Sequence, residues 1–423
     1  MEKPVKVLFL NSTDIYGGAA RASYRLFEGL RELGTPVKML VRDKDSSDPD
    51  VISFKNYERK GWGVYLKKII WKIKNRIRKQ KWKKYPDREP AFLNDLDSVS
   101  LIQMIKSIDF DILHIHFVAN RFLDLHELTQ INKPIVWTLH DSWPFTGICH
   151  YFYDCRNYEK SCGCCPMLHS ENPNDFTRKI WKTKNKIYTK CKMFIVAPSI
   201  WIGKAANQSS LMRNFPLTVI PNGLNTQLYT PSSKLVARQY FGLKEGIIYV
   251  MFGAINALND SNKGFTLLLN ALVYLQNEIN LPVELLIFGA EKDVVFNEIS
   301  YPIHSMGIIR SDATLIQLYN SADVMVVPSL SEVFGQTASE AMSCGVPTVA
   351  FNCSGIQEVI DHKKTGYLAE PYDPKDLAKG IAWCIENNKD HTLSIQARKK
   401  VLENYEINKV CNQYIELYKT SLK

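Results

Sequence analysis

The sequence predicts an α/β protein built from two doubly wound, Rossmann-like domains. Nine short runs are apolar throughout instead of alternating, which is typical of parallel strands buried on both faces. Amphipathic stretches separate these runs, so the chain repeats strand, helix and strand, as in βαβ units with right-handed crossovers. The length of 423 residues suits two domains better than one.

The expected elements follow one another in two series. In the first half of the chain, strands are expected at 5–11, 37–41, 111–117, 134–139 and 193–198. In the second half, strands are expected at 247–253, 284–289, 324–328 and 347–351. The main helices are expected at 19–33, 264–278, 311–321, 336–343 and 405–422.

The strand pattern restarts near residue 217, after a polar stretch. We therefore expect an N-terminal domain over 1–210 and a C-terminal domain over 211–404. The final helix, 405–423, is a candidate to pack back on the first domain. Ligands in such folds bind at the carboxyl ends of the strands, so two facing sheets imply a cleft between them.

The composition is that of an ordinary globular protein, with 45% hydrophobic and 23% charged residues. No apolar run approaches the roughly 20 residues that cross a bilayer. The first residues run directly into a strand-like segment and show no signal peptide. Without an export signal, the ten cysteines are expected to be thiols in a reducing compartment. These features predict a cytoplasmic protein.

The net charge of +10 comes from one segment. Residues 55–88 hold fourteen Lys and Arg against two acidic residues, a balance of +12 that leaves −2 for the rest of the chain. Apolar residues of this segment fall on one helical face with basic residues around them, which suits a helix lying on an anionic membrane surface. The residues expected to contact the membrane are Trp62, Lys67, Lys68, Trp71, Lys72, Lys74, Arg76 and Arg78.

Two alternatives stay open for this segment. One is a core-facing helix with a solvated basic face, and the other is a nucleic-acid patch. A basic character confined to one segment argues against a protein that coats nucleic acid. We therefore expect a peripheral protein on the inner face of the cytoplasmic membrane, without a nucleic-acid partner.

Two glycines stand where the first expected strand gives way to the first helix. Gly17 and Gly18 let the backbone approach a phosphate or a sugar closely, with the helix amides directed at it. Arg21 follows within the first turn. The pattern differs from GxGxxG, and a Gly-Gly pair at such a position is also common in a plain tight turn.

The strongest motif is a pair of glutamates after the strand expected at 324–328. Glu332 falls in a Gly-containing loop, and Glu340 lies two turns into the helix that begins near Gln336. A loop carboxylate can accept hydrogen bonds from sugar hydroxyls, and a helix carboxylate can take both hydroxyls of a ribose. Free amides at the helix start suit a diphosphate. An arbitrary pair of glutamates would more often be solvated, but the residues around this pair are specific.

The stretch EVFGQTASEAMSCGVPTVAF at 332–351 resembles the signature of glycosyltransferase family 4, whose members are retaining enzymes of the GT-B fold. Further segments fit in the same order: PNGLNTQLYTP at 221–231, NKGFTLLLNAL at 262–272 and CSGIQEVIDHKKTGYLAEPYDPKDLA at 353–378. The resemblance covers nearly the whole chain. The subgroup that it resembles contains exopolysaccharide enzymes such as those of colanic-acid synthesis.

The resemblance implies a role for each matching residue. Glu340 would bind the ribose, Glu332 would contact the transferred sugar, and Lys263 would neutralise the leaving diphosphate. The donor would also meet a set of backbone and small polar groups: Gly17, Gly18, Arg21, Phe334, Gly335, Gln336 and Thr337. Many relatives carry an arginine a few residues before the lysine, but this sequence has none there. The second cation would then be Arg21 or Arg310.

A histidine and a cysteine cluster follow the strand expected at 134–139. His140 would hydrogen-bond and orient the donor sugar, by resemblance, whereas a plain structural histidine is the alternative. Half of the cysteines fall within the seventeen residues 149–165. Thiolates in that number and spacing suit a structural zinc site, with Cys164 or His150 as a spare ligand, and the alternative is a loop of packed, reduced thiols. The expected ligands are Cys149, Cys155, Cys162 and Cys165.

These features predict transfer of a sugar from a nucleotide diphosphate to an acceptor hydroxyl, with retention. The resemblance implies front-face attack without a protein nucleophile, in which the enzyme positions the reactants and stabilises charge. No acidic metal-binding motif such as DxD lies at the end of an expected strand, where Asp141 and Asp323 stand alone, so no catalytic metal or other cofactor is expected. A lipid-linked saccharide of exopolysaccharide, capsule or O-antigen synthesis is the expected acceptor. An epimerase or phosphorylase of the same fold, or a non-catalytic scaffold, is the alternative.

Overall fold

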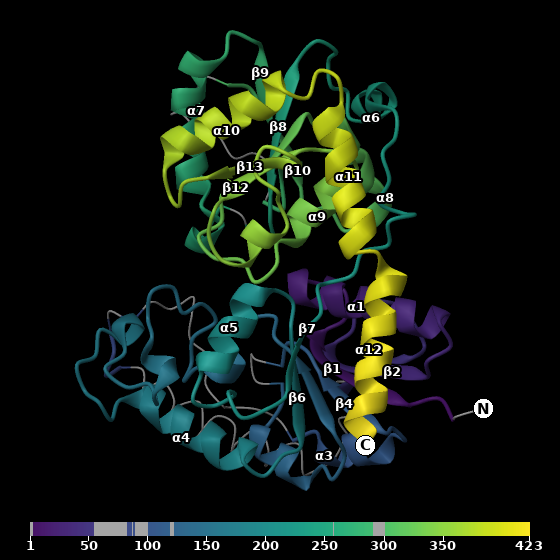
Figure 1. The fold of residues 1–423 in the computed structure, drawn as a ribbon, viewed down its shortest axis with the longest axis vertical. Coiled ribbons are helices and arrows are strands. Elements are labelled where there is room, and N and C mark those ends of the chain that lie inside the picture. The colour runs from purple at the N-terminus through teal and green to yellow at the C-terminus, as the bar shows by residue number, and fades with distance from the viewer. Residues whose placement is uncertain are drawn as a thin grey trace, which may run out of the picture. The chain divides into compact units, whose positions relative to one another are not determined.

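A computed structural model describes residues 3–54, 83–86, 88, 100–118, 122–256, 258–290 and 301–423. The chain forms two compact units, coloured from purple to yellow along the sequence in Figure 1. Unit 1 comprises 1–197, 203–219 and 415–423, and unit 2 comprises 198–202 and 220–414. Each unit contains one parallel sheet with helices, so the predicted α/β class is confirmed.

The sheet of unit 1 has the order β3-β2-β1-β4-β5-β6-β7, and every pairing in it is parallel. Its strands are β1 (Val7–Thr13), β2 (Val37–Asp43), β3 (Val51–Ser53), β4 (Ile112–Ile115), β5 (Ile135–Thr138), β6 (Met193–Ala197) and β7 (Leu217–Val219). Its helices are α1 (Gly18–Glu32), α3 (Ile102–Ser107), α4 (Phe176–Tyr188) and most of α5 (Ile200–Gln208).

The sheet of unit 2 has the order β10-β9-β8-β11-β12-β13 and is also parallel throughout. Its strands are β8 (Ile248–Gly253), β9 (Val283–Phe288), β10 (Ile303–Gly307), β11 (Val324–Val327), β12 (Thr348–Phe351) and β13 (Gly366–Ala369). Its helices are α6 (Lys234–Tyr240), α7 (Phe265–Glu278), α8 (Asp312–Ser321), α9 (Gln336–Ser343), α10 (Pro374–Glu386) and α11 (Thr392–Asn404).

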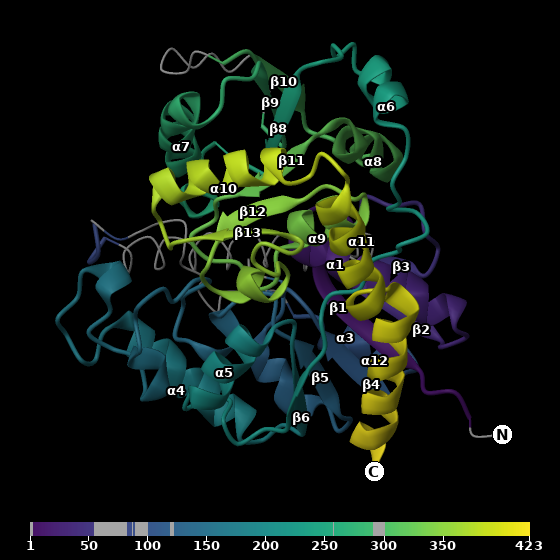
Figure 2. The ribbon, with the colours of Figure 1, turned by 45° about the horizontal axis from the view of Figure 1, so that its top comes forward.

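Both faces of the second sheet are buried, which explains why its strands are apolar at consecutive positions. In β8, Tyr249 and Met251 point into one hydrophobic cluster, and Val250 and Phe252 point into the other. Helices α8, α9 and α11 supply apolar residues to the first cluster, and α7 and α10 supply them to the second. Figure 2 shows α10 lying over this sheet, in agreement with its contacts to β12 and β13. A strand covered on both sides needs no polar face.

The nine predicted strands and five predicted helices are present in the structure, with ends shifted by a few residues. Four strands were missed: β3, β7, β10 and β13. All four are edge strands of their sheets. Their residues are partly exposed, so they do not form a continuous apolar run.

The passage between the units differs from the predicted boundary after residue 210. Strand β7 pairs with β6 and extends the first sheet, so the long continuous part of unit 2 begins at Ile220. Helix α12 (Ile407–Leu422) begins in unit 2, and its last residues belong to unit 1. There the Tyr418 hydroxyl contacts the Nδ1 atom of His114 on β4 at 2.8 Å. This contact anchors the end of the chain on the first sheet.

Candidate active site

Unit 2 gathers its polar motifs at the point where its strand order reverses. The chain builds β8, β9 and β10 toward one edge of the sheet, then returns to place β11 on the other side of β8. Lys263 follows β8, and Glu332 follows β11. Loops at the carboxyl ends of two adjacent parallel strands diverge and leave a crevice, which is the usual ligand position in such sheets.

Lys263 and Glu332 form an ion pair at this position. The Nζ atom of Lys263 lies 2.8 Å from Oε1 of Glu332, and the two side chains are 18% and 21% exposed. The neighbouring Asn262 is fully buried and ties the two loops together. Its side-chain amide donates to the carbonyl of Ser331 at 2.9 Å, and its own carbonyl accepts from the amide of Leu330 at 2.8 Å. The pair is thus held by rigid loops at both ends.

Gly264 makes the close approach of these loops possible. Its backbone has φ +67°, and a Cβ atom there would overlap the carbonyl oxygen of Pro328 at the end of β11. Gly242 has the same φ of +67°, but no atom lies within 4 Å of its Cβ position. Alanine substitutions at these two glycines therefore distinguish the cost of backbone strain from the cost of steric overlap.

We expect Gly264→Ala to lower the free energy of unfolding of unit 2 by about 3 kcal/mol or more. The positive φ alone costs about 1 kcal/mol, and the overlap with Pro328 adds the cost of moving a packed strand end. Gly242→Ala should lower the free energy of unfolding only by the cost of the positive φ. Urea unfolding of both variants measures the difference, and equal destabilisation would show that the close approach is unimportant.

Helix α9 carries the second glutamate of the motif. The helix begins after Gly335, which has φ 98° and packs against Ile356. Glu340 is only 3% exposed, and its Oε2 atom accepts a hydrogen bond from the Tyr319 hydroxyl at 2.8 Å. Burial raises the pKa of Tyr319 well above its usual value, and the charge of Glu340 raises it further, so the phenol remains a donor. The carboxylate is fixed in one orientation.

The other residues predicted to meet the donor divide into two kinds. Gln336 and Thr337 are half-buried in the first turn of α9. Phe334 instead packs in the hydrophobic core, 4% exposed, with its ring 5.1 Å from that of Tyr405. Any contact of Phe334 with a ligand would come from its backbone, because its side chain is occupied by packing.

Unit 1 also has its polar residues at a strand-order reversal, between β1 and β4. Gly17, with φ 110°, precedes α1, and a Cβ atom there would meet nothing within 4 Å. The loop before it is held by Asp14, whose carboxylate accepts from the amides of Asp45 and Ser46 at 2.9 and 2.8 Å. Burial acts to raise the pKa of Asp14, but these amides outweigh it and hold the pKa below its usual value. Gly18 and Arg21 lie in the first turn of α1, which follows this loop in the chain.

His140, which follows β5, belongs to a row of three neighbouring histidine rings with His116, which follows β4, and His114 within β4. Its Nε2 atom lies 3.0 Å from Nδ1 of His116, and the ring of His116 lies 4.1 Å from that of His114. Burial lowers the pKa of His140 to about 4, although the charge of Asp141 acts in the opposite direction. Burial also places the pKa of His116 well below its usual value. Burial likewise lowers the pKa of His114 well below its usual value, so the three rings are uncharged at pH 7.

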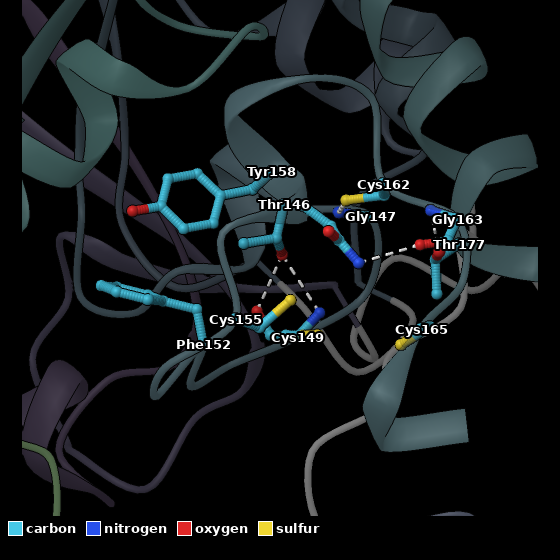
Figure 3. Close-up of a pocket in the computed structure, with 11 residues that line it drawn as sticks. Thr146, Gly147, Cys149, Phe152, Cys155, Tyr158, Cys162, Gly163, Cys165 and Thr177 are labelled. Carbon is cyan, nitrogen blue, oxygen red and sulfur yellow. Dashed lines mark hydrogen bonds between the residues drawn. The ribbon is translucent and has the colours of Figure 1, made fainter. Parts of the chain in front are cut away.

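The four predicted zinc ligands line one small cavity of unit 1 (Figure 3). The structure therefore brings together side chains that are up to sixteen positions apart, since the cavity is lined by Cys149, Cys155, Cys162 and Cys165.

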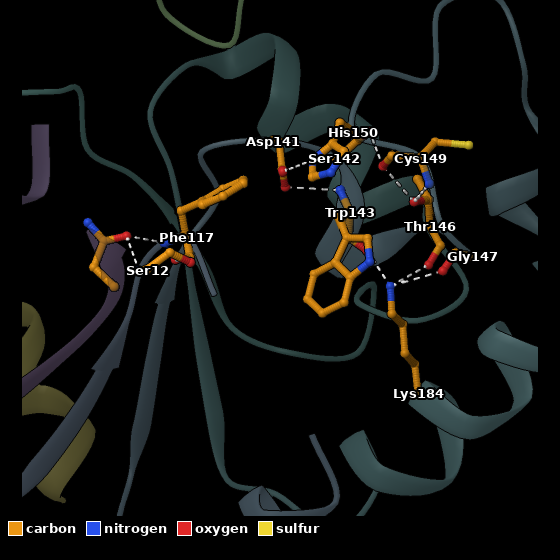
Figure 4. A network of polar contacts seen from close by, with 11 residues as sticks. Ser12, Phe117, Asp141, Ser142, Trp143, Thr146, Gly147, Cys149, His150 and Lys184 are labelled. Carbon is orange, nitrogen blue, oxygen red and sulfur yellow. Dashed lines mark hydrogen bonds and ion pairs between the residues drawn. The ribbon is translucent and has the colours of Figure 1, made fainter. Parts of the chain in front are cut away.

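The loop before this cavity is held by a polar network (Figure 4). Oδ2 of Asp141 contacts Nδ1 of His150, and its other carboxylate oxygen accepts from the amide of Trp143 at 3.1 Å. The fully buried Lys184 donates to the carbonyls of Thr146 and Gly147 at 3.0 and 3.1 Å. Burial lowers the pKa of Lys184 to about 7. The loop after His140 is thus fixed by side chains from within its own unit.

Comparison with known proteins decides the family. The family described as Glycosyltransferase Family 4 matches residues 16–228, and Glycosyl transferases group 1 matches residues 246–401. The first match alone spans half of the chain. This protein belongs to glycosyltransferase family 4.

The matches to individual relatives have low sequence identity but extend over long parts of the chain. An uncharacterized glycosyltransferase of Methanocaldococcus jannaschii is 22% identical over 328 residues, which cover 74% of this chain and 76% of that protein. Mannosylfructose-phosphate synthase of Agrobacterium fabrum is 28% identical over 207 residues, 45% of this chain and 44% of the synthase. The chain thus spans less than half of the synthase that it matches.

A solved structure supports the fold of this family 4 protein. Anabaena HepE, in complex with UDP-glucose, superposes with a TM-score of 0.66 at 18% identity, over 98% of this chain and all of HepE. The predicted GT-B class is therefore confirmed, and the chain is a glycosyltransferase.

Two further predictions for this glycosyltransferase concern residues away from Lys263 and Glu332. Arg310, a candidate second cation, follows β10 and lines a cavity of about 510 Å³ with Met306 and Ile308. Strand β9 separates β10 from β8, so Arg310 comes from a strand two positions away from the one that precedes Lys263. The residues predicted to contact a membrane, between Trp62 and Arg78, lie outside the described residues. No helix in the described ranges is long and apolar enough to cross a membrane.

Several residues that shape the site were not predicted from sequence. Tyr319 orients Glu340, Asn262 joins the Lys263 and Glu332 loops, and His116 pairs with His140. The sequence contained a clue to two of these residues. Asn262 directly precedes Lys263, and His116 is a polar residue at the end of an apolar strand. Tyr319 had none, since it lies on a helix that reads as ordinary core.

Proposed function

We propose that this enzyme transfers a glycosyl unit from a nucleoside diphosphate sugar to an acceptor hydroxyl, with retention of configuration. The observation that carries the proposal is the arrangement in unit 2. A buried, oriented carboxylate, Glu340, and an ion pair, Lys263 with Glu332, belong to loops and a helix at the strand-order reversal of a family 4 chain. Few other ligands need a carboxylate for a diol, a cation for a diphosphate and a second carboxylate for a sugar.

Each residue has a role in this proposal. Glu340 accepts hydrogen bonds from the ribose hydroxyls, and the backbone amides of the first turn of α9 receive the diphosphate. Lys263 neutralises the charge that develops on the leaving diphosphate. Glu332 accepts from the hydroxyls of the transferred sugar while it holds Lys263 in position.

Residues of unit 1 are proposed to complete the reaction. Gly17, Gly18 and Arg21 lie at the start of α1, where amides favour an anion. Neutral His140 hydrogen-bonds the donor sugar, and a pKa of about 4 keeps it uncharged at physiological pH. A neutral imidazole held by His116 orients a hydroxyl without competing for the cationic sites. The acceptor then attacks from the face that the leaving diphosphate occupies.

For the acceptor, we propose a lipid-linked saccharide of an exopolysaccharide, capsule or O-antigen. The support is the sequence of the basic segment, whose aromatic and basic residues suit an anionic membrane surface. Deletion of 60–84 is expected to abolish co-sedimentation with anionic vesicles and to leave donor binding intact. Unchanged sedimentation would refute the membrane part of the proposal.

A donor panel tests the transfer itself. Purified protein is titrated calorimetrically with UDP-, GDP-, ADP- and dTDP-sugars, and bound donors are then tested for hydrolysis and for transfer to simple glycosides. At least one donor should bind and turn over, and the anomeric configuration of the product, read by NMR, should equal that of the donor. Inversion would refute retention. Binding without any turnover would favour a scaffold, and interconversion of free nucleotide sugars would favour an epimerase.

A further inference from the structure

The cavity lined by Cys149, Cys155, Cys162 and Cys165 has the size and chemistry of a site for one ion. Its volume is about 20 Å³, and a cavity of roughly 10–15 Å³ already holds a single water molecule. An organic ligand or an iron–sulfur cluster is too large for this space. Four sulfur atoms around a single-particle cavity are the donor set of a tetrahedral metal.

The sulfur atoms receive backbone hydrogen bonds that suit thiolates. The amide of Gly147 donates to Sγ of Cys162 at 3.2 Å. The amides of Met167 and Leu168 donate to the sulfur of Cys165. The amide of Asn157 donates to the sulfur of Cys155. Backbone amides that donate to sulfur are common partners of cysteine ligands around a metal ion.

The loop geometry brings the last two ligands to the same cavity. Cys162, Gly163 and Cys164 are consecutive residues with positive φ, at 53°, 92° and 44°. A left-handed conformation costs a non-glycine residue about 1–2 kcal/mol, so this turn needs a compensating interaction. The amide of Cys165 donates to Oδ2 of Asp175 at 2.9 Å, which fixes the end of the turn on α4. Cys164 instead points outward and is exposed.

We propose that these four cysteines bind one structural Zn²⁺ ion. Among the described residues, no three His, Cys, Asp or Glu side chains lie close enough together to hold a metal ion, so binding at this cavity requires the sulfurs to move closer to one another. Cys149 and Cys165 already share a hydrogen bond between their thiols. A change of one χ1 rotamer moves a cysteine sulfur without moving the backbone. Such coupling of metal binding to local closure is usual for structural zinc sites.

The ion would stabilise the loop that follows His140. The Oγ atoms of Ser142 and Thr146 both donate to the carbonyl of Cys149, at 3.0 Å each. The amide of Ser142 donates to the carbonyl of His150 at 3.0 Å. A ligand at position 149 is therefore joined by hydrogen bonds to the residues beside Asp141 and His150. The zinc has no open position in this arrangement and takes no part in chemistry.

Elemental analysis of the full-length protein, purified without chelators or immobilised-metal chromatography, tests the site. We expect about one zinc per chain. Cys149→Ser and Cys162→Ser should lose nearly all of it. Cys164→Ser, in the same loop but outside the cavity, should keep it. Zinc that is retained in Cys162→Ser but lost in Cys164→Ser would overturn this ligand set.

Wild-type protein alone gives a second test that does not depend on the folding of variants. Protein refolded with Co²⁺ should show the intense sulfur-to-cobalt charge-transfer absorption and the visible bands of tetrahedral cobalt. Thiol titration under denaturing conditions after metal removal should find all ten cysteines reduced. Fewer thiols would mean that disulfides close the loop, and ten thiols without metal binding would mean packed thiols. Either outcome would overturn the proposal.

Discussion

Glu340→Gln should lower kcat/KM for the donor by about 10²- to 10³-fold. Hydrogen bonds to a charged group contribute about 1.5–3 kcal/mol each, and Glu340 is proposed to receive two from the ribose. The carboxylate is 3% exposed and oriented by the Tyr319 hydroxyl, so its geometry is already fixed before the donor binds. Glutamine keeps the shape of the side chain but removes the charge and one acceptor.

Donor analogues show whether this loss arises at the ribose. With a donor that lacks the ribose 2′-hydroxyl, Glu340→Gln should cost much less than with the natural donor, because one of its hydrogen bonds is already absent. Tyr319→Phe should give an intermediate loss, mainly in KM, since it removes only the orienting hydroxyl. Glu386→Gln, at the exposed end of α10, is the matched control and should behave as wild type. Wild-type kinetics in Glu340→Gln would exclude the ribose role.

Lys263→Met should lower kcat by about 10²- to 10³-fold, the usual cost of removing one group that stabilises developing charge. The effect is expected in kcat more than in the donor Kd, because the charge on the diphosphate grows as the glycosidic bond breaks. Lys263→Arg should recover part of the rate by restoring the cation. Single-turnover kinetics with saturating donor measures the chemical step.

A matched ion pair in the same unit provides the control. Lys400 pairs with Asp361 at 2.6 Å, with the lysine 13% exposed, but it lies on α11 and has no proposed role. Lys400→Met should therefore leave kcat unchanged. Glu332→Gln should also be tested, because in a double-mutant cycle with Lys263→Met the two losses should not add. Additive losses would mean that the pair does not act as a unit.

The loop and helix positions of the two glutamates in unit 2 were readable from the sequence because they depend on neighbouring residues. Glu332 and Glu340 are eight positions apart, and the loop-then-helix placement expected for them is the one observed at α9. Lys263 precedes a glycine whose positive φ begins α7. Such short-range patterns survive in the sequence because turn and helix geometry depends on a few neighbouring residues.

Contacts between distant segments were not readable in this way. The pairing of Lys263 with Glu332 joins residues 69 positions apart, and that of Glu340 with Tyr319 joins residues 21 apart. Phe334 was assigned to the donor from its place in a motif, but its ring packs against Tyr405 in the core. A motif gives the position of a residue along the chain, not the direction of its side chain.

The sequence by itself determined the α/β class, the two series of parallel strands and the family, because each depends on periodicity or on short motifs, and it named candidate donor residues whose roles stay predictions. Only the tertiary structure decided where β7 and the end of α12 belong, that His140 sits in a neutral histidine row, and that four cysteines share one cavity. The histidine row arises because strand order brings the ends of β4 and β5 to one edge of the sheet, whereas the other facts depend on how segments of the chain pack within their unit. Strand order is set by the packing of the whole unit and leaves no local trace in the chain.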